Sequence, residues 1–208
     1  PLPTWQTEMD FLNDDRGNPM VAWPMRLFDC SPVSDGAATV LLVSEELAHH
    51  FTDAPLYLIG SGQGSDGALH SRSTLTSIPS ARVAAKEAYQ MAGVTPDDID
   101  LAEVHDCFTI AEIMASEDLG FFAPGTGGKA AEAGETARTG RHPINTSGGL
   151  KSKGHPVGAS GIGQVVEIWK QLRGTAGERQ LPGNPTLGLT HNVGGTGQTC
   201  TVHIFERR

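Results

Sequence analysis

The apolar residues of this chain gather in short runs that are separated by glycine-rich or polar turns. The run AATVLLV, at 37–43, is continuously apolar and predicts a buried strand. Further strands are predicted at 55–62, at 101–107, and at the stretches HPINTSGG, PTLGLTHNVGG and TCTVHIFER. A glycine-rich turn joins the last two of these strands.

Helical spacing of apolar residues alternates with these strands. In IPSARVAAKEAYQMAGV the alanines recur at helical intervals, and we expect Ser80 to cap the start of this helix and Gly93 to stop it. Other helices are predicted at EELAHHF after Ser44, at FTIAEIMASEDLG, and over about 158–173. Residues 123–141, which are rich in glycine and alanine, predict a long surface loop.

The alternation of strands and helices predicts an α/β fold with a layered sheet that is parallel for most of its width. We expect 1–28 to be an irregular segment, a loop or the end of a preceding domain, followed by one domain at 29–208. Ligands of such folds bind at the carboxyl ends of the strands. Three clusters follow predicted strands, namely His105–Asp106–Cys107, Gly148–Gly149 and His191–Asn192.

Composition narrows the classes of function. The net charge is −9 without any basic patch, so we expect no nucleic-acid partner. No apolar run approaches the roughly 20 residues that span a bilayer, and no secretory signal is visible, so we expect no membrane span. Three scattered cysteines argue against a disulfide framework and favour a reducing compartment such as the cytoplasm. No His/Cys spacing indicates a metal site.

A first candidate for chemistry is His155, which lies between Gly154 and Pro156 just before a predicted helix. The free N–H groups and positive dipole end of that helix would suit a developing oxyanion or a thiolate beside this histidine. The alternative is a histidine in a tight glycine turn that performs no chemistry. The spacing alone leaves both open.

The stretch EVHDCFTIAE contains the second candidate. If 101–107 is extended, His105 and Cys107 lie on the same face, because strand side chains alternate. Such a pair could supply a hydrogen-bond donor and a proton shuttle. The alternative is that Cys107 is a small buried hydrophobe, as most free cysteines are.

Four stretches, CSPVSDGAATVLLVSEE, DIDLAEVHDCF, INTSGGLKSKGHPVGASG and HNVGGTG, occur in the order found in the C-terminal half of a thiolase. The sequence most resembles the sterol carrier protein type of thiolase, whose hallmark is His-Asp-Cys-Phe and whose relatives include lipid-transfer proteins and acetyl-CoA acetyltransferases. The resemblance covers about 25–206. It implies α-β-α layers around a mostly parallel, five-stranded mixed sheet.

The resemblance also implies a role for each of four residues. His155 would activate a nucleophilic cysteine and help to hold the thioester oxygen. His105 would replace the asparagine of other thiolases in one oxyanion hole, and the backbone N–H of Gly194 would serve the second. Cys107, as a thiol with a lowered pKa, would move a proton to or from the α-carbon of the acyl group. The substrate would be a coenzyme A thioester, with no permanently bound cofactor.

Two positions depart from the pattern of most thiolases. The C-terminal Cys-x-Gly motif is replaced by Asn192-Val193-Gly194, as the sterol carrier protein type also does. The nucleophilic cysteine lies in the N-terminal half of thiolases, which this sequence does not contain. We therefore expect the chain to be inactive without that half, either fused or as a separate subunit. We also expect the chain to form a homo-oligomer and to bind a small zinc-ribbon or oligonucleotide-fold accessory protein.

Two other functions remain open. Some thiolase-fold relatives are lyases that cleave hydroxyacyl-CoA by retro-aldol chemistry without a cysteine nucleophile. A non-catalytic module that binds acyl-CoA or lipid is the second alternative. The presence of Cys107 argues against the first, and the joint presence of the four site residues argues against the second.

For several residues near the motifs we expect structural or peripheral roles. Asp106 could orient a histidine, but we favour a cap for the helix that starts at Phe108. Cys30 and Cys200 are expected in the core, and His191 near the site rather than in it. Lys151 and Lys153 could attract phosphates of coenzyme A, although surface lysines are more often simply solvated.

Overall fold

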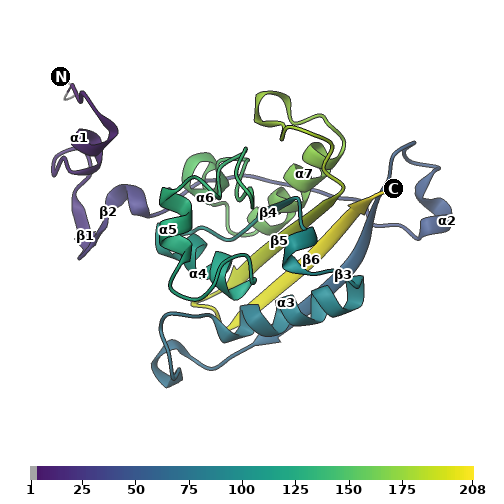
Figure 1. The fold of residues 1–208 in the computed structure, drawn as a ribbon, viewed down its shortest axis with the longest axis horizontal. Coiled ribbons are helices and arrows are strands. Elements are labelled where there is room, and N and C mark those ends of the chain that lie inside the picture. Colours follow the sequence, from purple (N-terminus) through teal and green to yellow (C-terminus); the bar gives the residue numbers. More distant parts are fainter. Residues whose placement is uncertain (1–3) are drawn as a thin grey trace.

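Four strands form the central sheet, in the order β3-β6-β5-β4. In the computed structural model, which describes residues 4–208, helices cover both faces of this sheet (Figure 1). The strands are β3 (Leu56–Ser65), β4 (Leu101–Glu103), β5 (Leu187–Gly194) and β6 (Thr199–Arg207). The expected α/β class with α-β-α layers around a mixed sheet is thereby confirmed.

The strand directions differ from the prediction. Only β4 and β5 run parallel, whereas β6 pairs antiparallel with both β5 and β3. The sheet over residues 4–208 is therefore neither five-stranded nor mostly parallel. The reason is that β6 folds back directly after β5 and inserts between β5 and β3. The predicted strand at HPINTSGG contributes one parallel bridge, from Ile144 to Ala102.

The apolar run at 37–43 is not a buried strand, and that prediction is wrong. It forms no strand in the described chain, and Leu41 and Leu42 are 66% and 75% exposed. Within residues 4–208, no strand of the sheet pairs with this run. A strand needs such a neighbour, because its backbone N–H and C=O groups bond outside the strand itself. The run therefore stays an extended segment with its apolar side chains in solvent.

Residues 4–208 contain seven α-helices. They are α1 (Glu8–Leu12), α2 (Glu45–Ala48), α3 (Pro79–Ala92), α4 (Thr109–Asp118), α5 (Gly127–Glu132), α6 (Gly149–Lys153) and α7 (Ser160–Leu172). Helix α3 packs on β3 and β6, whereas α7 packs on β5 and β4. Short 3-10 turns occupy Leu27–Asp29, Leu69–Ser71, Pro96–Asp98 and Gly177–Arg179.

Glycines let α3 approach β3 closely. A Cβ at Gly62 or Gly64 would collide with the backbone carbonyl of Ala84 or Ser80. Helix α3 ends at Gly93, which is left-handed as predicted (φ 70°). Its start was predicted wrongly, because Ile78 is the N-cap and the Ser80 hydroxyl instead donates to the carbonyl of Gly197.

Three segments contain elements that the pattern did not predict. The predicted loop at 123–141 contains α5, and the short α6 precedes His155. The segment expected to be irregular contains α1 and a small hairpin of β1 (Met20–Ala22) and β2 (Met25–Arg26). It extends away from the sheet in Figure 1. The domain boundary at 28/29 stays a prediction.

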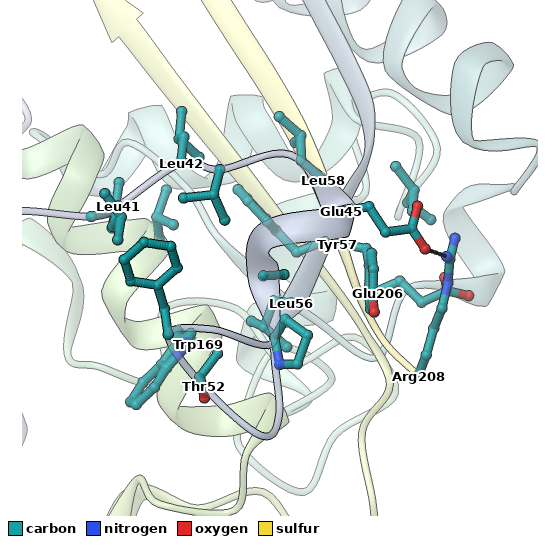
Figure 2. Close-up of a pocket in the computed structure, with 18 of the residues that line it drawn as sticks. Leu41, Leu42, Glu45, Thr52, Leu56, Tyr57, Leu58, Trp169, Glu206 and Arg208 are labelled. Atoms are coloured by element: carbon teal, nitrogen blue, oxygen red, sulfur yellow. Dashed lines mark hydrogen bonds and ion pairs between the residues drawn. The ribbon is translucent and has the colours of Figure 1, made fainter.

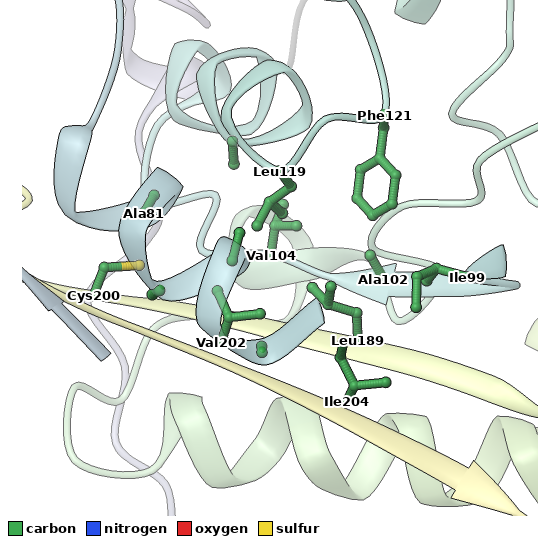
Figure 3. Close-up of a cluster of buried hydrophobic side chains, with 14 of the residues drawn as sticks. Ala81, Ile99, Ala102, Val104, Leu119, Phe121, Leu189, Cys200, Val202 and Ile204 are labelled. Carbon is green, nitrogen blue, oxygen red and sulfur yellow. The ribbon is translucent and has the colours of Figure 1, made fainter. Parts of the chain in front are cut away.

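The main core lies between the sheet and the helices α3 and α4. Figure 3 shows Val104, Leu189 and Ile204 meeting Leu119 there, with Cys200 at one end. Cys200 is fully buried, as expected. A second cluster joins α7 to the other face of the sheet, through Leu101, Ile168, Leu172, Leu181 and Phe205. Strand β4 is thus fixed from both sides, and the segment that follows it carries the candidate site.

Candidate active site

The segment after β4 carries three candidate side chains into the interior. His105 is 7% exposed, Asp106 is buried, and Cys107 is half-buried. This segment is held at both ends. The amide of Val104 donates to Oδ1 of Asn145 at 2.8 Å, and the carbonyl of Cys107 accepts from the amide of Ser31 at 2.9 Å.

The structure brings the two candidate histidines together. The ring centroids of His105 and His155 lie 4.9 Å apart, with the ring planes at 85°. His155 stands in the loop between α6 and α7, fifty residues further along the chain. Two residues that the sequence placed on separate motifs therefore share one site.

Ser160, the first residue of α7, holds His155. Its hydroxyl lies 2.7 Å from Nδ1 of His155 and donates to the carbonyl of Pro156 at 3.0 Å. A hydroxyl has one proton, and a carbonyl can only accept. Both bonds form together when Nδ1 of His155 donates to Ser160, which leaves Nε2 of His155 as a proton acceptor. The sequence analysis did not single out Ser160.

Asp106 has a different role from either one considered in the sequence. Its carboxylate accepts from the amides of Leu150 at 2.7 Å and Lys151 at 3.3 Å, at the start of α6. It does not cap the helix after Phe108, because α4 has no side-chain cap. Its side-chain hydrogen bonds within residues 4–208 go to these two amides and not to a histidine. Asp106 instead joins the His105 segment to the helix that precedes His155.

The thiol of Cys107 is less acidic than expected. Burial raises its pKa, and the neighbouring Asp106 and Cys30 raise it further. The expectation of a lowered pKa is therefore wrong in direction, and near neutral pH Cys107 holds its proton. Cys30 lies at the edge of the site rather than in the core. It is half-buried and forms an antiparallel bridge with Phe108.

Burial also keeps two histidines neutral. It lowers the pKa of His105 to about 4, with a smaller contribution from His155. It lowers the pKa of His191 to about 3. His191 is fully buried, and its Nδ1 accepts from the amide of His105 at 3.4 Å. His191 thus supports the site from behind, as expected of a residue near it.

Asn192 and Gln164 belong to the site, although the sequence assigned neither of them a role in it. Nδ2 of Asn192 lies 3.3 Å from Nδ1 of His105 and 3.4 Å from Oε1 of Gln164. The sequence marked Asn192 as part of a cluster after a predicted strand and as a replacement in the Cys-x-Gly motif, without a role of its own. The helical position of Gln164 on α7 carried no signal that it faces β5.

The remaining predicted residues lie around this centre. Gly194 ends β5 and is exposed, and its role as an oxyanion donor stays a prediction. Nζ of Lys151 donates to the carbonyl of Cys30 at 2.9 Å, and Nζ of Lys153 donates to the hydroxyl of Ser147 at 2.6 Å. Both lysines are thus engaged within the chain.

A groove of about 1020 Å³ lies away from these residues (Figure 2). Leu41 and Leu42 from the extended run face Trp169 of α7 and Leu58 of β3 across it. None of the predicted site residues lines it. We place the chemistry at the histidine pair, because the groove is lined mostly by apolar side chains, and its carboxylates Glu45 and Glu206 are paired with Arg208.

Within residues 4–208, no group of three or more His, Cys, Asp or Glu residues could hold a metal ion. No helix in that part of the chain is long and apolar enough to cross a membrane.

Comparison with known proteins identifies the family. The model of the family described as thiolase C-terminal domain-like matches residues 62–207. The chain belongs to this thiolase family. It is similar to acetyl-CoA acetyltransferase of Methanothermobacter thermautotrophicus, with 54% identity over 90% of the chain and 49% of that protein. It is also similar to sterol carrier protein 2 of Bos taurus, with 38% identity over 88% of the chain and 34% of that protein.

Solved structures agree with the thiolase fold. The structure titled Ltp2-ChsH2(DUF35) aldolase matches with a TM-score of 0.81 and 28% identity, over 94% of this chain and 51% of that one. A monomeric SCP2-thiolase like protein of Mycobacterium smegmatis shares the fold, with a TM-score of 0.67 and 19% identity, over 99% and 41% of the two chains. The chain thus spans about half the length of the first curated relatives that it matches.

Proposed function

We propose that this chain is the C-terminal half of an acyl-CoA thiolase, which cleaves 3-ketoacyl-CoA by thiolysis or forms it by Claisen condensation. The observation that carries the proposal is the pairing of His105 and His155, whose rings lie 4.9 Å apart. A Claisen reaction passes through an enolate next to a thioester. Stabilising that oxyanion is the largest task of such a site.

Each residue has a definite task in this reaction. His155, whose Nε2 can accept, takes the proton of the nucleophilic cysteine supplied by the N-terminal half. That cysteine attacks the 3-keto carbon, and the bond between the α-carbon and this carbon breaks to leave an acyl-enzyme and an enolate. His105 donates a hydrogen bond to the enolate oxygen. Cys107 donates its proton to the α-carbon, a role that suits its raised pKa. Coenzyme A then attacks the acyl-enzyme, its thiol proton passes to the Cys107 thiolate, and the released nucleophilic cysteine regains its proton from His155.

The N-terminal half is the partner that we propose for assembly. The chain matches only 49% of its archaeal relative, and the exposed run at 37–43 is apolar. Burial of such a run on a second unit would stabilise assembly. The second half would also supply the nucleophile and complete the site.

The test is mass spectrometry of the assembled enzyme after incubation with a short 3-ketoacyl-CoA. We expect an acyl adduct on a cysteine outside these 208 residues. Replacement of Cys107 by serine should abolish turnover and still allow the adduct. An adduct on Cys107 itself would overturn this division of roles. Turnover by the Cys107→Ser variant at the normal rate would remove Cys107 from the chemistry. Neither adduct nor turnover in the wild-type assembly, with acyl-CoA still bound, would leave a non-catalytic acyl-CoA-binding or lipid-binding module as the better description.

A second candidate is an aldolase. The similarity to the structure titled Ltp2-ChsH2(DUF35) aldolase, at a TM-score of 0.81, favours it. That title names a DUF35 chain as the partner of the aldolase, which supports the expected small accessory protein. An aldolase would cleave hydroxyacyl-CoA without any acyl adduct and would not depend on the thiol of Cys107. The same incubation therefore separates the two reactions.

A further inference from the structure

A chain of amide groups connects the backbone of β5 to the ring of His105. Nε2 of Gln164 donates to the carbonyl of His191 at 3.0 Å. A carbonyl can only accept, so this bond fixes which end of the Gln164 amide is nitrogen. Oε1 of Gln164 then faces Asn192, at 3.4 Å from its Nδ2.

The orientation passes on to His105. Because Oε1 of Gln164 accepts, the Asn192 atom that faces it must be the donor, Nδ2. The same Nδ2 lies 3.3 Å from Nδ1 of His105. An amide nitrogen has two protons, so one bonds Gln164 and the other bonds the histidine. Nδ1 of His105 is therefore an acceptor without a proton.

We propose that Asn192 and Gln164 are positioning residues that fix His105 as a neutral imidazole with its only ring proton on Nε2. In this tautomer Nε2 is the donor that an oxyanion requires. The catalytic meaning of this assignment rests on the proposed function, whereas the proton position does not. The asparagine found at the Cys-x-Gly position thereby acquires a task of its own.

Burial makes this arrangement strict. Gln164 is fully buried and His105 nearly so, which leaves little water to compete for their polar atoms. The ionisable groups beside His105 are the imidazoles of His155 and His191. Burial and the nearby His155 lower the pKa of His105, so that the ring stays neutral at physiological pH.

Helix α7 leaves the room that the Asn192 amide needs. A Cβ added at Gly161 would lie 3.3 Å from Nδ2 and 3.4 Å from Cγ of Asn192. Gly163, on the same helix, has open space around its Cβ position. The two glycines therefore form a matched pair, in which only the first substitution presses on the amide.

The first experiment is neutron diffraction from crystals of the complete enzyme, this chain assembled with its N-terminal half, at neutral pH. We expect deuterium on Nε2 of His105 and none on its Nδ1. Deuterium on Nδ1 would overturn the proposal. If Nε2 carries the deuterium in an enzyme that does not act on 3-ketoacyl-CoA, the proposed function fails and the tautomer assignment stands.

Kinetics provide the second readout. Asn192→Leu, which keeps the size and removes the donor, should lower kcat about 10- to 100-fold with little change in KM, because the ring proton is no longer held on Nε2. Gly161→Ala should lower kcat in the same direction, whereas Gly163→Ala should not. Normal kcat in both Asn192→Leu and Gly161→Ala would overturn the positioning role. The glycine variants keep the test open if Asn192→Leu fails to fold.

Discussion

At the scale of single residues, burial sets the protonation of His105 and Cys107. His105 has a pKa of about 4, and Cys107 has a raised pKa, so both are uncharged near neutral pH. A neutral imidazole donates one hydrogen bond and a thiol donates one proton. These two residues thus act as neutral donors rather than as fixed positive charges.

His105 should be replaceable by a residue that keeps a donor. We expect His105→Ala to lower kcat by about 10²–10³, the usual loss of one oxyanion donor. His105→Asn should retain more activity, because its Nδ2 can still donate. Steady-state kinetics of the assembled enzyme measure both. Equal losses in the two variants would show that His105 does more than donate a hydrogen bond.

Glu112 should make stability depend on pH. Burial raises its pKa from 4.5 to about 7, although Nδ2 of Asn145 donates to it at 2.7 Å. The folded chain therefore keeps a proton that the unfolded chain releases, and wild-type stability falls as pH rises from 4.5 through 7. Glu112→Gln removes this loss. We expect the variant to gain about 2–3 kcal/mol relative to wild type between pH 4.5 and 8.

Urea unfolding followed by circular dichroism measures this gain. The control is Glu132→Gln on the exposed face of α5. The difference between its unfolding free energy and that of wild type should be the same at every pH. A constant difference between Glu112→Gln and wild type at all pH values would contradict the prediction.

The sequence could supply only part of this residue-scale description. His105, Cys107 and His155 were predicted, because each lies in a recognisable motif and carries reactive chemistry. Asn192 and Gln164 were missed because their contacts join residues 28 and 87 positions apart in the chain. Amide groups give no sequence signal for such contacts, which exist only once α7 packs on β5.

At the scale of elements, the short α6 is the connection between the two motifs of the site. Its second and third amides, those of Leu150 and Lys151, donate to Asp106, so the start of α6 is tied to the segment that carries His105 and Cys107. Gly149 makes this contact possible, because a Cβ there would collide with the Asp106 carboxylate. Helix α6 then leads directly to the loop of His155.

Removal of this cap should weaken both the fold and the site. We expect Asp106→Ala to cost about 2–3 kcal/mol of unfolding free energy, because two buried amides lose their acceptor. Asp106→Asn keeps an oxygen for the amide of Leu150 and should cost about 1 kcal/mol. Urea unfolding of the three proteins at pH 7 tests the order. A larger loss in Asp106→Asn than in Asp106→Ala would exclude the capping role.

Most elements could be predicted because their apolar pattern coincides with their burial. Strands β5 and β6 and the helices α3, α4 and α7 fall within predicted segments, and β3 runs three residues past its predicted end at 62. The predicted strand at 37–43 was wrong because an apolar pattern shows what a segment can bury, not whether a neighbouring strand is present. Strand direction failed for a related reason, since the pattern does not say that β6 returns between β5 and β3.

At the scale of the whole molecule, one side of the chain exposes an apolar surface that lies outside the core. The extended run and the groove behind it form this surface, with Leu42 75% exposed and Trp169 on the opposite wall. No backbone hydrogen bond within residues 4–208 involves the run at 37–43. Unpaired backbone beside exposed leucines is typical of a segment that another unit covers.

Leu42→Lys should therefore weaken assembly with the N-terminal half without disturbing the fold of this chain. A lysine at this position would bring a charge into the apolar contact, so we expect at least a tenfold weaker Kd, about 1.4 kcal/mol. Leu75→Lys, at a site that is 65% exposed and outside the groove, is the control and should bind normally. Sedimentation velocity measures the affinity, and circular dichroism verifies the fold of each variant.

Hydrogen exchange tests the same contact directly, because the amides of 37–43 should exchange rapidly in the separate chain and become protected on assembly. Normal binding by Leu42→Lys together with unchanged exchange would place the partner on another face, and the run would then need a different explanation.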